Sequence, residues 1–190
     1  MNVFFMKQFL RNPRHVGAIC PSSKKLADTI TSEVGLSEAA VVAELGPGTG
    51  VFTEMIFSKK KEETSFFVVE LNSEMCELLE QRFEDIKIFN RSATELAGML
   101  EELSKSRLDL VVSGLPWASF PDKLQDDILE AVTANLKAGG YFTTFAYLQG
   151  MLLPAAQKFK RKLSERFSEV TTSPVVWGNV PPAFVYRCKL

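Results

Sequence analysis

The sequence is poor in the residues that build disulfide frameworks and metal centres. It contains three cysteines, Cys20, Cys76 and Cys188, which are far apart and show no C-x-x-C spacing. Its single histidine is His15. An odd number of scattered cysteines excludes a disulfide scaffold and indicates reduced thiols in a cytoplasmic protein. With one histidine and no cysteine pair, we expect no metal site.

Excess charge and long apolar runs are also missing. The 190 residues have a net charge of −1, so no global basic excess argues for nucleic acid as a partner. No apolar run reaches the length of a membrane span. Lys7 and Arg11 interrupt the apolar residues near the start, which is untypical of a secretion signal. We therefore expect one domain over residues 1–190, located in the cytoplasm.

One stretch organises the chain. Val41–Leu45 is apolar enough for a buried strand, Gly46-Pro47-Gly48-Thr49-Gly50 forms a glycine-rich turn, and Val51–Ile56 has helical spacing. Strand, turn and helix in this order are the first unit of a parallel α/β sheet. The glycines let the backbone turn and let a ligand approach it closely. Val51 replaces the third glycine of the nicotinamide fingerprint, which argues against that cofactor.

Two acids strengthen this interpretation. Glu44 lies two residues before the first glycine, and the pattern Glu-x-Gly-x-Gly-x-Gly resembles the nucleotide loop of class I S-adenosylmethionine-dependent methyltransferases. Glu70 ends the next apolar strand, about twenty residues after the loop, where an acid can bind ribose hydroxyls. The resemblance implies S-adenosylmethionine as cofactor and S-adenosylhomocysteine as product.

The rest of the chain alternates between strand and helix patterns. Met75, Leu78, Leu79 and Phe83 are the expected inner side of the helix that Asn72 or Ser73 begins. Arg91-Ser92-Ala93 follows the third strand, where methyltransferases often hold an acid beside adenine; here the contact would come from the backbone or Ser92. The expected strands are 41–45, 65–69, 86–90, 108–112, 141–147, 170–176 and 183–189, and the expected helices include 24–34, 94–105, 122–136 and 154–167. This pattern matches an α/β, Rossmann-like, seven-stranded class I methyltransferase sheet.

The fourth strand ends in a second informative loop, Ser113-Gly114-Leu115-Pro116-Trp117-Ala118-Ser119-Phe120-Pro121. Ligands of open α/β sheets bind at the carboxyl ends of strands, so this loop faces the cofactor. It resembles the (Asn/Asp/Ser)-x-Pro-(aromatic) loop of amino-group methyltransferases. Main-chain carbonyls near Ser113 to Leu115 can orient the lone pair of an amine, and Trp117 can cover the developing positive charge. The alternative is that Trp117 simply fills the core.

Over nearly its whole length the sequence resembles bacterial phospholipid N-methyltransferases, which methylate phosphatidylethanolamine towards phosphatidylcholine. Besides the two loops, the resemblance rests on Phe9–Arg14 and on Gly17-Ala18-Ile19-Cys20-Pro21-Ser22-Ser23. It implies cofactor contacts for Glu44, Gly46, Gly48, Gly50 and Glu70, and it places the Ser113 loop and the loop 14–23 around the methyl group and the amine. We further expect cofactor contacts from Pro47, Thr49, Leu71, Ser92, Ala93 and Ser113. For the acceptor amine the candidate residues are Ser113, Gly114, Leu115, Trp117 and His15.

Residues 1–23 are expected to form an N-terminal amphipathic helix extension and an active-site loop, ahead of the Rossmann-like core at 24–190. Around Val3–Leu10, Phe5 and Phe9 share one helical side, while Lys7 and Arg11 share the other. An aromatic face opposite a basic stripe is typical of a helix lying on an anionic membrane surface. A helix docked on the domain, or a disordered terminus, is the alternative. Likewise His15 is either a base for the substrate ammonium or a loop histidine without catalytic role.

Three functions remain in competition. The first is methylation of a phosphatidylethanolamine-type lipid by an enzyme peripherally bound to the inner membrane face. The second is adenine N-methylation of a nucleic acid, which the expected lack of a target-recognition domain disfavours. The third is a non-catalytic membrane adaptor with a cofactor fold. Neither the lipid, the number of methyl transfers nor the oligomeric state follows from the sequence.

Overall fold

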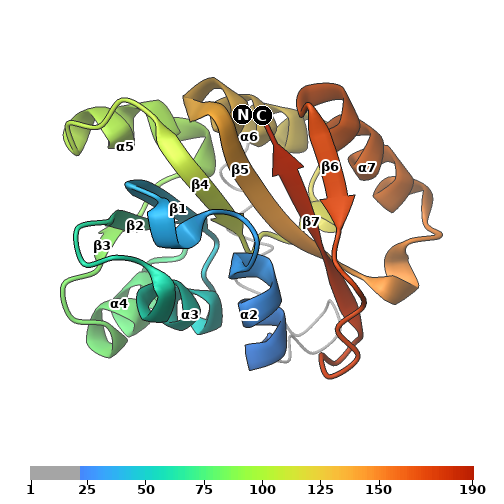
Figure 1. Cartoon of the computed structure of the whole chain (residues 1–190), viewed down its shortest axis with the longest axis horizontal. Coiled ribbons are helices and arrows are strands. Elements are labelled where there is room, and N and C mark those ends of the chain that lie inside the picture. Colours follow the sequence, from blue (N-terminus) through green and yellow to red (C-terminus); the bar gives the residue numbers. More distant parts are fainter. Residues whose placement is uncertain (1–21) are drawn as a thin grey trace.

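Seven strands form one sheet at the centre of the molecule (Figure 1). The computed structural model describes residues 22–190. The strands are β1 (Val41–Leu45), β2 (Ser65–Val69), β3 (Lys87–Phe89), β4 (Leu108–Ser113), β5 (Leu136–Tyr147), β6 (Glu169–Thr172) and β7 (Ala183–Lys189). Their order is β3-β2-β1-β4-β5-β7-β6, and β7 is antiparallel to both of its neighbours. This order is that of the class I methyltransferase fold, so the expected fold class is confirmed.

Helices cover both faces of the sheet (Figure 1). On one face lie α2 (Lys24–Thr31), α3 (Val51–Lys59) and α4 (Ser73–Arg82); on the other lie α5 (Leu96–Glu102), α6 (Asp122–Asn135) and α7 (Pro154–Arg166). Short 3-10 turns are η2 (Leu36–Glu38), η3 (Ala93–Glu95), η4 (Trp117–Ser119) and η5 (Leu148–Gly150). Every residue of β1 is buried, as expected for a central parallel strand. Alternation along β1 sends Val42 and Glu44 towards the α2–α4 face and Ala43 and Leu45 towards the other.

Local signals in the sequence place the helix starts. The Ser23 hydroxyl accepts a hydrogen bond from Leu26 N–H at 3.1 Å, which caps α2. The Asn72 side chain accepts from Glu74 N–H at 2.9 Å and caps α4. Each cap satisfies backbone donors that the first helical turn leaves without partners. The predictions for both helix starts are therefore confirmed.

The direction of chain progression reverses at β1. From β1 the chain moves outwards to β2 and β3, and it then returns to place β4 on the other side of β1. In open α/β sheets a ligand crevice lies at the carboxyl ends of the strands where such a reversal occurs. The topology therefore predicts a ligand site among the loops that follow β1, β2 and β4.

Some element boundaries and faces differ from expectation. The strand β5 begins at Leu136 rather than at Tyr141 as predicted. Its pairing with β4 shifts in register between Leu108 and Leu110, and this irregularity lets residues 137–140 form part of the strand. β6 ends at Thr172, and Val176 forms only an isolated bridge with Ala183. On α4 the buried residues are Cys76 and Leu79, whereas the predicted inner residue Leu78 is 54% exposed.

No helix within residues 22–190 is long and apolar enough to cross a membrane; the longest, α6, has 14 residues. The predicted amphipathic helix and the loop 14–21, with His15, lie outside the described residues. They stay predictions.

Candidate active site

Two loops leave the sheet at the same point. Leu45, the last residue of β1, lies opposite Val69 of β2 on one side and opposite Ser113 of β4 on the other. Beyond the strands, Gly46 N–H donates to the Val69 carbonyl at 2.9 Å, and Gly114 N–H donates to the Leu45 carbonyl at 2.8 Å. The glycine loop after β1 and the loop after β4 are therefore anchored to each other at their first residues.

The three glycines of the first loop all have positive φ, but their surroundings differ. A Cβ on Gly46 would lie 2.6 Å from Leu115 Cδ2, and a Cβ on Gly50 would lie 2.7 Å from the Phe83 ring. A Cβ on Gly48 would meet nothing within 4 Å. Gly46 and Gly50 are thus needed for packing within the protein, while the exposed Gly48 presents its backbone to an approaching molecule.

The other loop residues complete a tight turn. Pro47 is buried, and its carbonyl accepts from Gly50 N–H at 3.0 Å. Thr49 is exposed, and its carbonyl accepts from the Arg82 guanidinium at the end of α4. The turn is consequently held from inside by its own backbone and from outside by α4.

Glu44 is fully buried beneath this loop. The Thr53 hydroxyl on α3 donates to Glu44 Oε2 at 2.7 Å, whereas Oε1 has no hydrogen-bond partner among the described residues. Burial raises the pKa of Glu44 from 4.5 to about 8; the Thr53 hydrogen bond opposes this shift and the nearby Glu70 adds to it. A buried carboxyl with one unpaired oxygen favours a cationic partner, which would supply the missing interaction.

Glu70 follows β2 and turns back towards the glycine loop. Its Oε1 accepts from Asn72 N–H at 2.9 Å. Burial raises the pKa of Glu70, and backbone N–H groups of Asn72, Leu71 and Gly48 oppose the shift. The carboxylate thus connects the end of β2 with Gly48, and the half-buried Leu71 contributes through its backbone.

Asn90, at the end of β3, was missed by the sequence analysis. Its Nδ2 donates to the Glu70 carbonyl at 2.9 Å and contacts Cys76 Sγ at 3.5 Å. Asn90 thereby fixes the backbone that carries Glu70. The available signal was its position, since a polar residue ending a parallel strand lies on the ligand edge.

Ser92 and Ala93, predicted beside adenine, begin η3. The Ser92 hydroxyl accepts from Thr94 N–H at 3.3 Å, and the Glu95 carboxylate accepts from Ser92 N–H at 3.1 Å. This reciprocal arrangement is a capping box, and Ala93 is buried behind it. These contacts explain the two residues as helix-starting elements, and their contact with a cofactor stays a prediction.

The loop after β4 is fixed around the buried Ser113. Ser113 Oγ accepts from Leu115 N–H at 3.3 Å and from the Trp117 indole N–H at 3.1 Å. The Thr144 hydroxyl of β5 donates to the Ser113 carbonyl at 3.2 Å. One hydroxyl therefore sets the conformation of the next four residues.

Gly114 is where this loop crosses the glycine loop. A Cβ at position 114 would lie 2.4 Å from the Gly46 carbonyl oxygen, a separation that Cβ atoms do not show. Only glycine lets the two backbones meet at this distance. The predicted acceptor and cofactor loops are thus in direct main-chain contact.

Trp117 lies in the core rather than on the surface. Its side chain is 3% exposed and stacks on Phe159 of α7 at 4.9 Å between ring centroids. Gln125 of α6, which the sequence analysis missed, donates from Nε2 to the carbonyls of Trp117 at 2.9 Å and Phe120 at 3.1 Å. The packing alternative for Trp117 accounts for all of these contacts, and its role over the acceptor amine stays a prediction.

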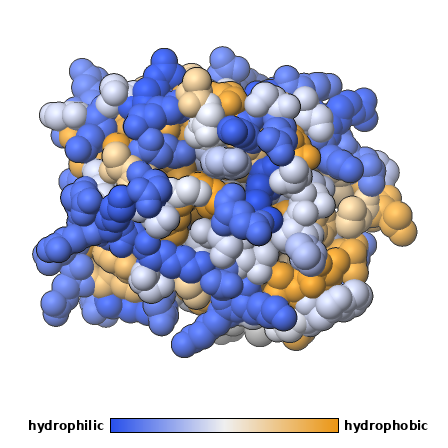
Figure 2. Space-filling view, in the orientation of Figure 1, coloured by the Kyte–Doolittle hydropathy of each residue, from blue (hydrophilic) through white to orange (hydrophobic). Residues whose placement is uncertain are grey.

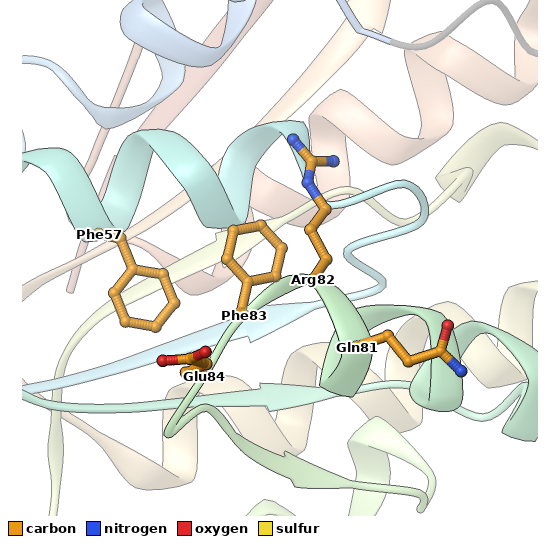
Figure 3. Close-up of a pocket in the computed structure, with 5 residues that line it drawn as sticks. All are labelled: Phe57, Gln81, Arg82, Phe83 and Glu84. Carbon is orange, nitrogen blue, oxygen red and sulfur yellow. The ribbon is translucent and has the colours of Figure 1, made fainter.

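A hollow of about 360 Å³ adjoins the outer side of the glycine loop, since two of its lining residues, Arg82 and Phe83, lie beside Thr49 and Gly50. Its lining consists of Phe57, Gln81, Arg82, Phe83 and Glu84, from the end of α3 and the end of α4 (Figure 3). Phe57 and Phe83 are stacked at 5.6 Å. The hollow contains none of the predicted site residues, so it belongs to the α3–α4 packing surface. Among residues 22–190 no cluster of His, Cys, Asp and Glu is arranged to hold a metal ion.

Comparison with known proteins gives two kinds of match. The family model described as ribosomal RNA adenine dimethylase matches residues 2–173. The chain is 29% identical to an ornithine lipid N-methyltransferase of Singulisphaera acidiphila, over 97% of this chain and 94% of that protein. It is 30% identical to a ribosomal RNA small subunit methyltransferase A of Hydrogenobaculum, over 52% of this chain but only 36% of that protein.

Solved structures agree on the fold. An O-methyltransferase from Streptomyces achromogenes, determined in complex with S-adenosylmethionine, superposes with a TM-score of 0.69 and 12% identity over 100% of this chain and 91% of that chain. An O-methyltransferase from Bacillus cereus, determined in complex with S-adenosylhomocysteine, superposes with a TM-score of 0.70 and 10% identity over 97% of this chain and 90% of that chain. These two structures thus hold S-adenosylmethionine or its product, and the cofactor predicted for this chain is S-adenosylmethionine. The residues present fit it, because its cationic methionine part suits the unpaired oxygen of Glu44, its ribose suits Glu70, and Gly48 leaves the backbone open.

A matched pair of glycine variants separates cofactor binding from packing. Alanine in place of Gly48 or Gly50 would have to adopt a positive φ, which costs roughly 1–2 kcal/mol of folding free energy. Gly50→Ala also presses on Phe83, so its melting temperature should fall further. Gly48→Ala should therefore lose less melting temperature than Gly50→Ala but more affinity for S-adenosylmethionine relative to that loss. Calorimetry and thermal melts measure both quantities; unchanged affinity in Gly48→Ala contradicts the assignment.

The raised pKa of Glu44 predicts a pH-dependent stability. Between the ordinary pKa of 4.5 and the folded-state value of about 8, the cofactor-free folded protein binds the extra proton. The free energy of unfolding therefore falls as pH rises through this window. Glu44→Gln should remove this contribution, so that its melting temperature gains on the wild type with rising pH and stops gaining above about pH 8. Parallel curves for the two proteins would show that Glu44 is ionised throughout.

Proposed function

We propose a lipid amine as the methyl acceptor of this chain, which belongs to the ribosomal RNA adenine dimethylase family and is an S-adenosylmethionine-dependent methyltransferase. Phosphatidylethanolamine, with its methylated forms, is the acceptor that the sequence motifs favour. An ornithine lipid carries the same functional group, a primary amine attached to a membrane lipid. Placement in the class I methyltransferases was predicted and is confirmed, whereas the narrower phospholipid N-methyltransferase family is part of this proposal.

The observation that carries the choice of lipid is the extent of the similarity. The similarity to the ornithine lipid N-methyltransferase runs through 97% of this chain and 94% of that protein. The similarity to the ribosomal RNA methyltransferase of Hydrogenobaculum covers about half of this chain and about a third of that protein. Of these two relatives, the lipid enzyme is the one that is matched over nearly its whole length.

The two loops that meet at Gly46 and Gly114 supply the geometry for transfer. When bound, the cofactor supplies an electrophilic methyl group. The Ser113 carbonyl already accepts a hydrogen bond from the Thr144 hydroxyl, and the Leu115 carbonyl already accepts one from the backbone N–H of Trp117. We therefore assign the Gly114 carbonyl to the acceptor, where it would accept an N–H of the amine and orient the nitrogen lone pair. Such orientation is a major source of rate enhancement, up to about 7–11 kcal/mol in model reactions.

The core residues behind the loop hold this geometry. Ser113 Oγ restrains Leu115 and Trp117 from one side, and Gln125 restrains the carbonyls of Trp117 and Phe120 from the other. The stacking of Trp117 on Phe159 supports a positioning role for the indole. His15 is the candidate base that would leave the amine neutral; it lies outside the described residues.

Adenine methylation of ribosomal RNA is the second candidate. It is favoured by the family model, whose description names that substrate and which matches residues 2–173. It would use the same cofactor loop and the same Ser113 loop, so the described site does not distinguish an adenine amine from a lipid amine. The acceptor has to be identified by transfer.

Methyl transfer to a defined panel tests the proposal. Full-length protein is incubated with methyl-labelled S-adenosylmethionine and phosphatidylethanolamine, an ornithine lipid, phosphatidylcholine or small-subunit ribosomal RNA. We expect label in one or both amine lipids and none in RNA. Phosphatidylcholine is the matched control, because its nitrogen carries no hydrogen and accepts no further methyl. Label in RNA alone establishes the second candidate, and label in no acceptor favours a non-catalytic adaptor.

A further inference from the structure

Exposed apolar side chains gather on two neighbouring loops. Leu152 is 92% exposed and Leu153 57% exposed, in the segment between η5 and α7. Trp177 is 70% exposed and Val180 71% exposed, in the segment between β6 and β7. Figure 2 shows hydrophobic surface at the right of the molecule, over the segment that follows β5 in Figure 1. Large apolar side chains exposed together mark an interaction site rather than ordinary surface.

The two loops, 148–153 and 176–182, are tied together at their bases. Leu148 N–H donates to the Pro182 carbonyl at 2.9 Å, and Tyr147 pairs with Ala183 across β5 and β7. Asn179 is buried, and its side-chain amide donates to the Pro181 carbonyl at 2.8 Å. The apolar tips are thus carried on anchored loops.

Exposed basic side chains lie on the two helices that adjoin these loops, α2 and α7. Asn179 Oδ1 accepts from Ser23 N–H at 2.8 Å, so the start of α2, with the exposed Lys24 and Lys25, lies against the loop that bears Trp177. On α7, which follows Leu153 directly, Lys160 and Arg161 are exposed. Within the described part of the chain, the ion pairs include none of these four cations: Lys24, Lys25, Lys160 and Arg161.

The loops leave the same edge of the sheet as the candidate active site. Ser113 of β4 is paired with Thr144 of β5, and β5 continues for three residues to Tyr147. At about 3.3 Å per residue, the loops begin about 10 Å beyond the start of the Ser113 loop. A flat partner that meets the loop tips therefore also faces the Ser113 loop.

We propose that loops 148–153 and 176–182, which we call the apolar rim, dock the protein on a bilayer containing anionic phospholipid. Leucine and tryptophan tips enter the interface, where tryptophan is favoured because its ring is apolar and its N–H is polar. Lys24, Lys25, Lys160 and Arg161 complement the negative headgroups. Docking in this orientation presents the amine of a lipid to the Ser113 loop, so the inference rests on the proposed lipid function and adds where the bilayer is bound.

The two tryptophans make the test specific to one residue. The sequence contains Trp117, which is buried, and Trp177, which is 70% exposed. In full-length protein without lipid, iodide should therefore quench the emission of Trp177 and leave that of Trp117. Vesicles of phosphatidylethanolamine and phosphatidylglycerol should abolish most of this quenching and shift the emission to the blue, whereas phosphatidylcholine vesicles should do so weakly. Trp177→Phe is the control that removes the quenchable emission.

Vesicle flotation then measures the contribution of the rim. The double variant Leu152→Ser, Leu153→Ser should bind roughly tenfold more weakly or worse. Loss of Lys24 or Lys25 should weaken binding to anionic vesicles by roughly fivefold each. Leu78→Ser on α4 and Lys105→Glu before β4 are matched controls, since both residues are exposed and lie on other parts of the surface. Both controls should float like the wild type.

Several results would overturn the proposal. If the protein floats with the vesicles while iodide still quenches the emission of Trp177, the membrane contact lies elsewhere, for instance on residues 1–14. Equal flotation of the rim variants and the controls would do the same. Protection of Trp177 by ribosomal RNA, or by raising the protein concentration without lipid, would assign the rim to RNA or to a second copy.

Failure of docking and failure of the lipid function give different results. Methyl transfer to phosphatidylethanolamine in detergent micelles requires no bilayer. If the wild type labels the lipid there while Trp177 stays quenchable on vesicles, the rim is wrong and the function stands. If Trp177 is protected by anionic vesicles while no lipid is ever labelled, the rim is the membrane contact and the lipid acceptor is wrong.

Discussion

The site depends on the main-chain contact between Gly46 and Gly114. Because β1 and β4 are neighbours in register, with Leu45 opposite Ser113, their following loops start side by side. The hydrogen bond from Gly114 N–H to the Leu45 carbonyl then brings the backbone of one loop onto the carbonyl of the other, at a distance that admits no Cβ. The Leu115 side chain fills the space that a Cβ on Gly46 would need. The predicted cofactor loop and the predicted acceptor loop therefore have fixed relative positions, which is the preorganisation that methyl transfer would require.

Two buried carboxyl groups, those of Glu44 and Glu70, lie near this contact, and they differ in their hydrogen bonds. Glu70 accepts from several backbone N–H groups, including Gly48, so its orientation is set by the ends of β2 and of the glycine loop. Burial raises the pKa of Glu44 to about 8 although Thr53 hydrogen-bonds the carboxyl, and among the described residues Glu44 Oε1 has no partner. In the protein without cofactor, burial and the neighbouring Glu70 therefore both disfavour a negative charge on Glu44. A cationic ligand would reduce this cost, which is why we propose that Glu44 favours binding of the positively charged S-adenosylmethionine.

The sequence predicted best what is local. Strand, glycine loop and helix over 41–56 follow from turn chemistry and periodicity, and Asn72 follows from capping. The exposure of Leu78 and the burial of Trp117 depend on long-range packing, for Trp117 on Phe159 and Phe142, which no local pattern reports. Asn90 and Gln125 carry no motif, and their importance appears only when the Glu70 carbonyl and the Trp117 carbonyl lie beside them. Ser92-x-x-Glu95 did carry a signal, that of a capping box, but its position after β3 favoured a cofactor role.

The most direct test of the account is a methyl group added at Gly114. Gly114→Ala forces the two loops apart, and displacements of about 1 Å at a reacting centre cost roughly a hundredfold in rate. With the acceptor that the wild type methylates, single-turnover transfer should fall by at least about that factor. The melting temperature should fall as well, because the new Cβ would lie 2.4 Å from the Gly46 carbonyl oxygen, so transfer is compared at saturating S-adenosylmethionine and at a temperature where the variant is still folded. The control is Gly98→Ala on α5, where a Cβ meets nothing within 4 Å. Transfer by Gly114→Ala at the rate of the wild type and of Gly98→Ala would contradict the claim that this contact aligns the acceptor with the cofactor.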